Sequence, residues 1–461
     1  MSPAQPDPGT RRTAWREGLE RIADAATTEP GRLRVIGAVL AALLVAFGAV
    51  TAWQVTDRSS AADAVIDRSE PLSADAADIY RSLADADTAA AAGFLAGRDE
   101  PRTVRQRYEK DIGVASELLV KAAADTGGSS SARAQIARLN QQLPVYTGLV
   151  ESARAAGRQG LPLGGAYLRY ASDRMREDLL PAARALYEAE TGRLRSDYAD
   201  AKSWPWTALA TGVVALGALG WAQRRTFLRT NRVFNHGLLA GTAAGAVVLL
   251  WLTVGHAVAR ADLTDSYENG AKSLQVLSEA RIASLQARGD ESLTLVARGA
   301  VLTPAGDDAY EASYRTGMRK LIGGDVTASG EPAPDSLLGR ARSLADGSEG
   351  RDPVLEAIRD VKQWQQRHGE ARTADVGGYY GQALAKVIGE KGSARGSTGE
   401  SFDQVDTALR RALAHEEDDF RRAAGDGRGA FTGLAAGATV LAVLGAAGAV
   451  LGIGRRLSEY R

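Results

Sequence analysis

Few residues of the 461-residue chain have a type and spacing that could perform catalysis or hold a metal ion. None of the four histidines (His236, His256, His368 and His415) has a partner at metal-ligand spacing, and a sequence without cysteine has no thiolate ligand or thiol nucleophile. His415 precedes four acidic residues at 416–419, but on a helix such a run is typical of a solvated face. Phosphate-binding glycine loops, protein-kinase signatures and Gly-x-Ser-x-Gly elbows are also absent from the sequence. We therefore expect no catalytic residue, no metal, no cofactor and no enzymatic activity.

The charged residues give no sign of nucleic-acid binding or of a paired acid–base site. Lysine and arginine number 56, as do aspartate and glutamate, whereas a nucleic-acid-binding protein usually carries a basic excess. Asp85 and Asp87 are separated by one residue, and positions i and i+2 of a helix do not share a face. We interpret these two carboxylates as surface or helix-capping residues.

Four apolar segments predict transmembrane helices. Residues 35–55, 204–222 and 430–453 carry no charge, and residues 237–259 carry one ionisable group, His256, near their end. At 1.5 Å per residue, each segment can cross a hydrocarbon layer about 30 Å thick. The first segment is interpreted as a retained anchor, because its apolar run exceeds the roughly 7–15 residues of a signal peptide. The chain is thus predicted to be a multi-pass protein of the plasma membrane, embedded in the lipid bilayer.

Basic residues predict the orientation of these helices. Arginines are concentrated in residues 1–34, 223–236 and 454–461, and the positive-inside rule places such short segments in the cytoplasm. Both termini are then cytoplasmic, and residues 56–203 and 260–429 are extracytoplasmic. The cytoplasmic loop has four basic residues and no acidic one, so it is a candidate docking site for a cytoplasmic partner, unless its charge serves topology alone. These residues are Arg224, Arg225, Arg229 and Arg232.

Small residues recur at four-residue spacing in or near the predicted membrane helices. The pairs are Gly241 and Gly245, Gly433 and Gly437, and Gly448 and Gly452. Such spacing allows close helix contact in lipid, although a composition biased towards alanine and glycine would produce it too. We expect a compact membrane bundle and consider a homodimer.

The two extracytoplasmic segments are predicted to be helical bundles. Apolar residues recur with heptad spacing from Val65 to Ala90, which is the pattern of a long helix in an antiparallel bundle. Proline and glycine-rich interruptions divide the first segment into helices over roughly 57–97, 101–125, 132–156 and 163–203. Runs with period 2 and many β-branched residues are absent. The predicted fold class is all-α, with four transmembrane helices and two tandem extracytoplasmic four-helix bundles.

The second half of the chain resembles the first, which predicts an internal duplication. A shift of 202 residues superposes the first membrane helix on the third, and a shift of 227 residues superposes the second on the fourth. Single-residue matches keep the same order: Gly97 on Gly299, Tyr108 on Tyr310, Glu109 on Glu311 and Glu190 on Glu417. The extra residues of the second half are expected in loops near residues 323–350 and 389–399.

Two stretches of the first extracytoplasmic segment resemble the actinobacterial membrane proteins of the GlnX type. They are PLSADAADIYRSLADADT at residues 71–88, followed by GFLAG at 93–97, and RQGLPLGGAYLRYAS at 158–172. The plan of four membrane helices and two external helical segments is also similar to that family. The resemblance implies a signal relay, in which an extracytoplasmic solute-binding lipoprotein for glutamate or aspartate acts on the external domains. The membrane protein then passes this state to a soluble cytoplasmic Ser/Thr protein kinase.

Two other functions stay open from the sequence, namely a direct small-molecule receptor and a non-catalytic envelope scaffold. The cytoplasmic segments are too short for an output domain of their own, so a sensor of this plan must act through a docking surface.

The junctions between the membrane helices and the predicted extracytoplasmic segments differ in composition. Residues 52–56 and 258–261 contain no glycine or proline, whereas residues 204–206 contain a proline and residues 425–429 contain glycines. We therefore expect the first and third membrane helices to transmit movement, and the second and fourth to act as pivots.

Overall fold

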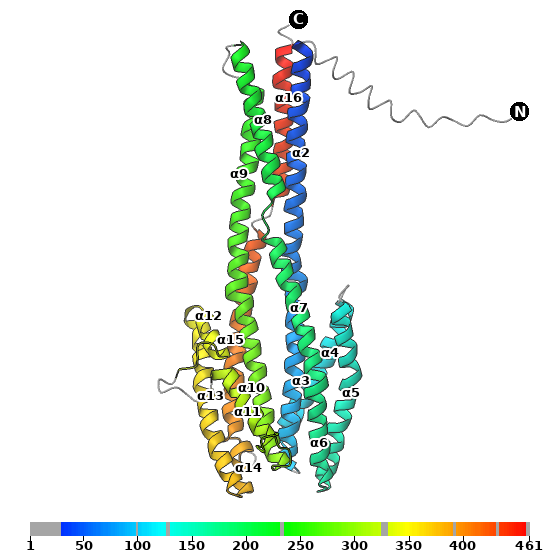
Figure 1. Cartoon of the computed structure of the whole chain (residues 1–461), viewed down its shortest axis with the longest axis vertical. Coiled ribbons are helices and arrows are strands. Elements are labelled where there is room, and N and C mark those ends of the chain that lie inside the picture. Colours follow the sequence, from blue (N-terminus) through cyan, green and yellow to red (C-terminus); the bar gives the residue numbers. More distant parts are fainter. Residues whose placement is uncertain are drawn as a thin grey trace, which may run out of the picture. The chain divides into compact units, whose positions relative to one another are not determined.

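The computed structural model describes residues 29–97, 100–125, 130–230, 235–323, 331–390, 393–429 and 433–457. Every regular element in these ranges is a helix, and β pairing within them is limited to two isolated bridges, Leu302–Asp308 and Glu390–Ser393. The predicted all-helical fold class is confirmed (Figure 1). The chain divides into two compact units. We call them the apolar unit (Met1–Ala62, Ala199–Asp262 and Asp426–Arg461) and the helical body (Asp63–Tyr198 and Leu263–Gly425).

The apolar unit is formed by the long helices that carry the predicted membrane segments. These helices are α2 (Glu29–Ala64), α8 (Trp206–Thr230), α9 (His236–Asp265) and α16 (Leu434–Leu457). By length and composition, four helices of the described residues can cross a membrane, as the sequence predicts. The second helix begins two residues later than predicted, after Pro205, and residues 430–432 of the predicted fourth segment lie outside the described residues.

Glycines allow α9 and α16 to pack closely. A Cβ atom added at Gly237 would lie 2.3 Å from the carbonyl oxygen of Gly448 in α16, so no larger residue fits without a backbone shift. The prediction that small residues permit close helix contact is confirmed here. Of the other glycines in the predicted pairs, Gly245 faces α8 and Gly437 faces Trp251 of α9, whereas Gly433 precedes α16 with a φ of 77°.

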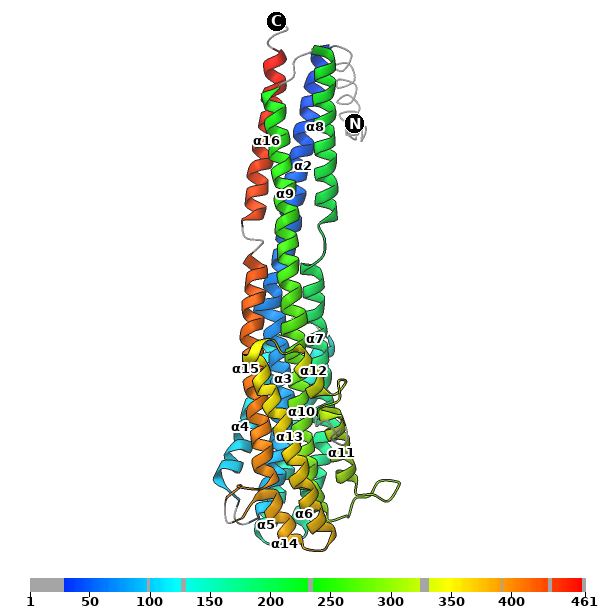
Figure 2. The ribbon, with the colours of Figure 1, turned by 90° about the vertical axis from the view of Figure 1, so that its left-hand side faces the viewer.

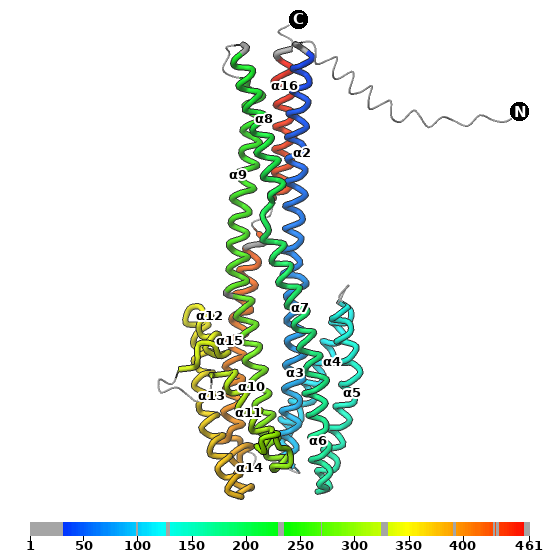
Figure 3. Tube along the Cα trace, in the orientation of Figure 1, coloured from blue at the N-terminus to red at the C-terminus, as the bar shows by residue number. Residues whose placement is uncertain are grey.

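The first half of the helical body contains the four helical segments that the sequence predicts. α3 spans Glu70–Ala96, α4 spans Arg102–Asp125 and α5 spans Ser130–Arg158. The fourth segment consists of α6 (Leu163–Arg174), the π-helical turn η3 (Met175–Leu179) and α7 (Leu180–Ala201). α2 leads into α3 through a second π-helical turn, η1 (Val65–Ser69), so the helical backbone is unbroken from α2 to α3 (Figure 3).

The second half of the helical body has six α-helices in its described residues. α9 continues through η4 (Ser266–Ala271) into α10 (Lys272–Ala297), which is followed by α11 (Ala309–Ile322) and α12 (Leu337–Leu344). α13 (Gly347–Val376), α14 (Tyr380–Ile388) and α15 (Thr398–Gly429) complete it. α12 lies within the range predicted as the first extra loop; Ser336 caps it by accepting a hydrogen bond from the Gly339 amide at 3.1 Å. Residues 324–330 of that loop lie outside the described residues.

The two halves of the helical body share one core. Buried residues of α3, such as Ile79 and Leu83, belong to the same hydrophobic cluster as Leu277 and Leu285 of α10. The Thr88 hydroxyl lies 2.9 Å from the carbonyl oxygens of both Ala84 and Leu285, so a side chain of α3 contacts the backbone of α10. Residues 56–203 and 260–429 are predicted to form two tandem bundles, whereas most of both lie in one compact unit.

Figure 2 shows the break between α7 and α8. Side chains from two other helices hold it. Arg58 of α2 donates to the carbonyl oxygens of Ser203 at 2.7 Å and Trp204 at 3.1 Å. Arg260 of α9 donates to the carbonyl oxygen of Lys202 at 2.9 Å. The backbone is interrupted at Pro205, whereas the glycines at residues 425–429, which were expected to soften the second junction, do not interrupt the helix: α15 continues to Gly429.

Candidate functional site

The middle of α3 and most of the second part of α10 are buried on all faces, polar groups included. Every residue from Ser82 to Ala91 of α3 is buried, and so are residues 280–285 and 287–295 of α10. Asp85 and Asp87 are among them, so their interpretation as surface or capping residues is wrong. As expected for positions i and i+2 of a helix, the two carboxylates have different partners: Asp85 binds Arg107, and Asp87 binds Tyr146.

Asp85 belongs to an ionic network that joins the two halves. Arg107 of α4 donates to Asp85 at 2.8 Å and to Asp403 of α15 at 3.1 Å. Arg281 of α10 donates to Asp406 of α15 at 2.5 Å. Burial alone would raise the pKa of Asp406, but three nearby arginines, Arg281, Arg107 and Arg410, hold it below its usual range. The network therefore keeps its charges paired, and it links α3 and α4 with α10 and α15.

Asp87 and Asp290 lie beside a cavity between α3, η3, α10 and α11, which we call the central cavity. Asp87 accepts hydrogen bonds from the Tyr146 hydroxyl at 3.2 Å and the Ser172 hydroxyl at 2.9 Å. Burial raises the pKa of Asp87, and it raises the pKa of Asp290 to about 6 although Arg176 opposes this shift. The cavity has a volume of about 720 Å³. It combines apolar walls with hydroxyl, amide and charged groups from both halves.

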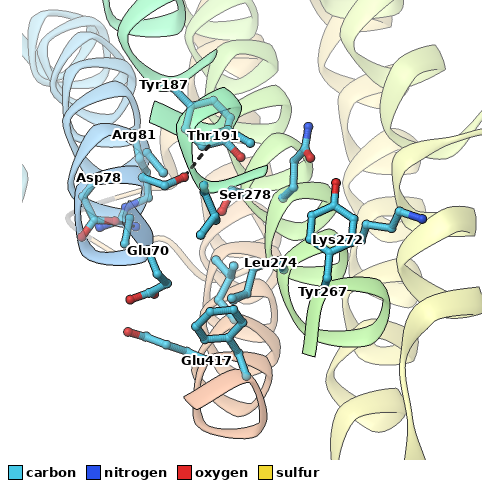
Figure 4. Close-up of a pocket in the computed structure, with 18 residues that line it drawn as sticks. Glu70, Asp78, Arg81, Tyr187, Thr191, Tyr267, Lys272, Leu274, Ser278 and Glu417 are labelled. Carbon is cyan, nitrogen blue, oxygen red and sulfur yellow. Dashed lines mark hydrogen bonds and ion pairs between the residues drawn. The ribbon is translucent and has the colours of Figure 1, made fainter. Parts of the chain in front are cut away.

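A second hollow, the carboxylate pocket, lies between α3, α7, η4, α10 and α15 (Figure 4). Figure 4 shows Glu70 from the start of α3 and Glu417 from α15, with Tyr187 and Thr191 of α7 on another side. Burial raises the pKa of Glu70 to about 7, and the charge of Glu417 adds to this shift. The pocket therefore contains a carboxyl group that titrates near neutral pH, next to the π-helical turn η1.

His368 is buried between two carboxylates of the second half. Its ring nitrogens lie 2.9 Å from Glu291 and 3.1 Å from Glu311, and its ring stacks on Tyr314 with centroids 3.7 Å apart. Burial opposes the charge of His368, but the two carboxylates outweigh it and raise the pKa of the imidazole to about 9. Residue spacing does not predict this cluster, because its members lie far apart in the sequence, on α10, α11 and α13.

The other residues singled out in the sequence have varied surroundings. Within the acidic run after His415, Glu416 is buried and Asp418 is exposed, so the solvated-face interpretation is wrong for Glu416. No group of three or more histidine or acidic side chains in the described residues could hold a metal ion. Of the candidate docking residues, Arg224, Arg225 and Arg229 are on α8, and Arg232 lies outside the described residues.

Comparison with known proteins gives one similarity. No curated protein and no solved structure matches the chain. Residues 61–199 match the family model of an actinobacterial sensor domain. These residues include α3–α7, the first half of the helical body, with Asp87 and Arg176 of the central cavity and Glu70 of the carboxylate pocket. The similarity therefore indicates a sensing role for a chain whose helices can cross a membrane four times.

Proposed function

We propose that the protein is a transmembrane signal relay of the GlnX type. In this proposal, an extracytoplasmic lipoprotein that binds glutamate or aspartate contacts the helical body, and a cytoplasmic Ser/Thr protein kinase receives the signal. The protein lies in the plasma membrane with both termini in the cytoplasm, and it acts without catalysing a reaction. The observation that carries the proposal is the match of residues 61–199 to a sensor domain.

The backbone supports a path for such a signal. The matched segment begins within α2, the helix that carries the first membrane segment, and no break in helical backbone separates α2 from α3. α9 is likewise continuous with α10 through η4. A rigid helix can transmit a small displacement along its axis, whereas an unstructured linker would absorb it.

An internal duplication is part of the proposal. The π-helical turn η1 begins at Val65 and η4 begins at Ser266, close to the shift of 202 residues found in the sequence. π-helical turns are rare, so their occurrence at corresponding places, directly after α2 and directly after α9, supports a common origin of the two halves. Each half would then supply one central helix and one flanking group of helices to the helical body.

The extracytoplasmic part of the proposal is tested by co-purification. The full-length chain is purified from its native membrane with and without L-glutamate or L-aspartate, and a bound solute-binding lipoprotein is identified by mass spectrometry. We expect a lipoprotein whose recovery depends on the amino acid. An amino-acid response that persists after deletion of the gene would refute the relay, and a loss of envelope integrity without loss of that response would favour the scaffold function.

The cytoplasmic part is tested at the basic loop. Changing Arg224, Arg225, Arg229 and Arg232 together to Gln removes four cations from a segment without an acid, and we expect recovery of the kinase with the protein to fall. Protease accessibility must first show that the orientation is unchanged, because the same charges favour a cytoplasmic loop. Undiminished recovery of the kinase with correct orientation would exclude this loop as the docking surface.

A further inference from the structure

The central cavity has the size and composition of a small-molecule site. Its volume of about 720 Å³ lies in the range of roughly 300–1,000 Å³ that is usual for ligand pockets. Ala84, Ala283 and Leu285 give it apolar walls. Hydroxyl and amide groups converge on it from the second half of the helical body, from Gln286, Thr303, Ser313 and Thr316.

Two cations face this cavity from opposite halves of the helical body. Arg176 comes from η3, and its guanidinium lies 5.2 Å from the centroid of the Tyr310 ring. Asp290 is its one ion-pair partner in the described residues, so most of its N–H groups have no protein acceptor there. Lys320 lies in the last turn of α11; it is exposed and has no ion-pair partner within the described part of the chain.

The acidic groups of the cavity are less available to a ligand than the cations. Both oxygens of Asp87 already accept hydrogen bonds, from Tyr146 and Ser172. Asp290 is buried and paired with Arg176. Oδ1 of Asp290 accepts no hydrogen bond but forms the ion pair with Arg176, so most of the free hydrogen-bonding groups on charged side chains of the cavity are the N–H donors of Arg176 and Lys320. A planar guanidinium with an ammonium group is a combination that binds carboxylates well.

We propose that the central cavity binds a small organic carboxylate, whose anionic group is held by Arg176 and Lys320. The apolar walls contact the carbon skeleton of this compound, and the hydroxyl groups of α11 hold its remaining polar atoms. Arg176 belongs to the first half and Lys320 to the second, so the ligand bridges the two halves. The proposal is independent of the relay described above, since a carboxylate can bind here whichever partner receives the signal.

The test uses the purified full-length chain in lipid nanodiscs, without lipoprotein or kinase. Binding of succinate, L-aspartate and L-glutamate is measured by isothermal titration calorimetry, with 1,4-diaminobutane as a probe of opposite charge. We expect saturable binding of at least one of the three carboxylates and none of the diamine. Absence of saturable binding of all three, or binding of the diamine alone, would overturn the proposal.

Variants assign the binding to this cavity. Lys320→Gln removes an exposed cation and should raise the dissociation constant of the bound carboxylate about tenfold, whereas Lys110→Gln, on the exposed face of α4, should leave it unchanged. Arg176→Lys keeps a cation beside Asp290 but loses the planar fork, and should weaken binding more than tenfold. Circular dichroism shows whether each variant is folded. Unchanged binding by both folded cavity variants would place the carboxylate elsewhere and refute the site.

Discussion

Replacing Glu70 by Gln should stabilise the protein at pH 8 and have little effect at pH 4.5. Glu70 is the first residue of α3, is 8% exposed, and lies in the carboxylate pocket near Glu417. Burial, and then the charge of Glu417, raise the pKa of its carboxyl group to about 7. Gln has almost the same shape as Glu but carries no charge, so the variant removes the cost of ionising this buried position.

The direction and size of the effect follow from the two pKa values. The folded value of about 7 is higher than the unfolded value of 4.5, so the folded state binds the proton more tightly. The stabilisation from the protonated group is fully present below pH 4.5 and is lost as the pH rises through 7. At about 1.4 kcal/mol for each pKa unit, the loss at pH 8 is about 3 kcal/mol, which Glu70→Gln should recover.

Thermal unfolding of the full-length chain in nanodiscs measures this effect. We expect the Tm of Glu70→Gln to exceed that of the wild type by several degrees at pH 8 and to match it at pH 4.5. Glu117→Gln, at an exposed position of α4, is the matched control and should change the Tm little at either pH. Glu417→Gln should move the midpoint of the wild-type pH dependence to lower pH, because it removes the neighbouring charge. A Glu70→Gln protein with the same pH dependence as the wild type would refute the reasoning.

Three other substitutions test separate parts of the structure. His368→Asn should lower the free energy of unfolding at pH 7 by about 3 kcal/mol, because the pKa of the imidazole is about 9 in the folded state and 6.5 in the unfolded state. The stabilisation from the protonated ring is complete below pH 6.5 and is lost as the pH rises through 9. The difference in Tm between the variant and the wild type should therefore shrink at high pH. Gly237→Ala should lower the Tm because its Cβ would meet the backbone of α16, whereas Gly220→Ala, in open space on α8, should not. Arg58→Gln should speed hydrogen exchange of the backbone amides within residues 201–206, because it removes the donors to the carbonyl groups of Ser203 and Trp204 and so loosens this break. Unchanged amide exchange there would contradict the role assigned to this arginine.

Local sequence signals were sufficient to predict the helices of the first half. Gly97 ends α3 with a φ of 61°, and Pro101 immediately precedes α4, so two residues with strong backbone preferences mark this boundary. The predicted segment 163–203 corresponds to α6, η3 and α7 together. The helix α12 was missed, because eight residues of helix in a stretch rich in glycine give too weak a periodic signal.

The candidate site cannot be predicted from the sequence for a different reason, which is the burial of α3 and α10. A helix that is buried on one side shows an apolar stripe, and its polar residues can then be assigned to the solvent. α3 packs against α4 on one side and α10 on another, so residues from Ser82 to Ala91 have no solvent-facing side. Asp85 and Asp87 are tolerated there because arginine, tyrosine and serine side chains from other helices satisfy their oxygens. Partners so distant in the sequence leave no local pattern.

The break between α7 and α8 was expected to be a pivot, but its hydrogen bonds indicate a coupling point. A helix that ends leaves carbonyl groups without intrahelical partners, and these can serve as attachment points for other elements. Here Arg58 of α2 binds the carbonyls of Ser203 and Trp204, and Arg260 of α9 binds that of Lys202. Gln54 of α2 also accepts a hydrogen bond from the amide of Ala208 at 2.9 Å, in the first turn of α8. A displacement of α2 or α9 would therefore act on the start of α8, so α8 should follow these two helices instead of turning freely against them.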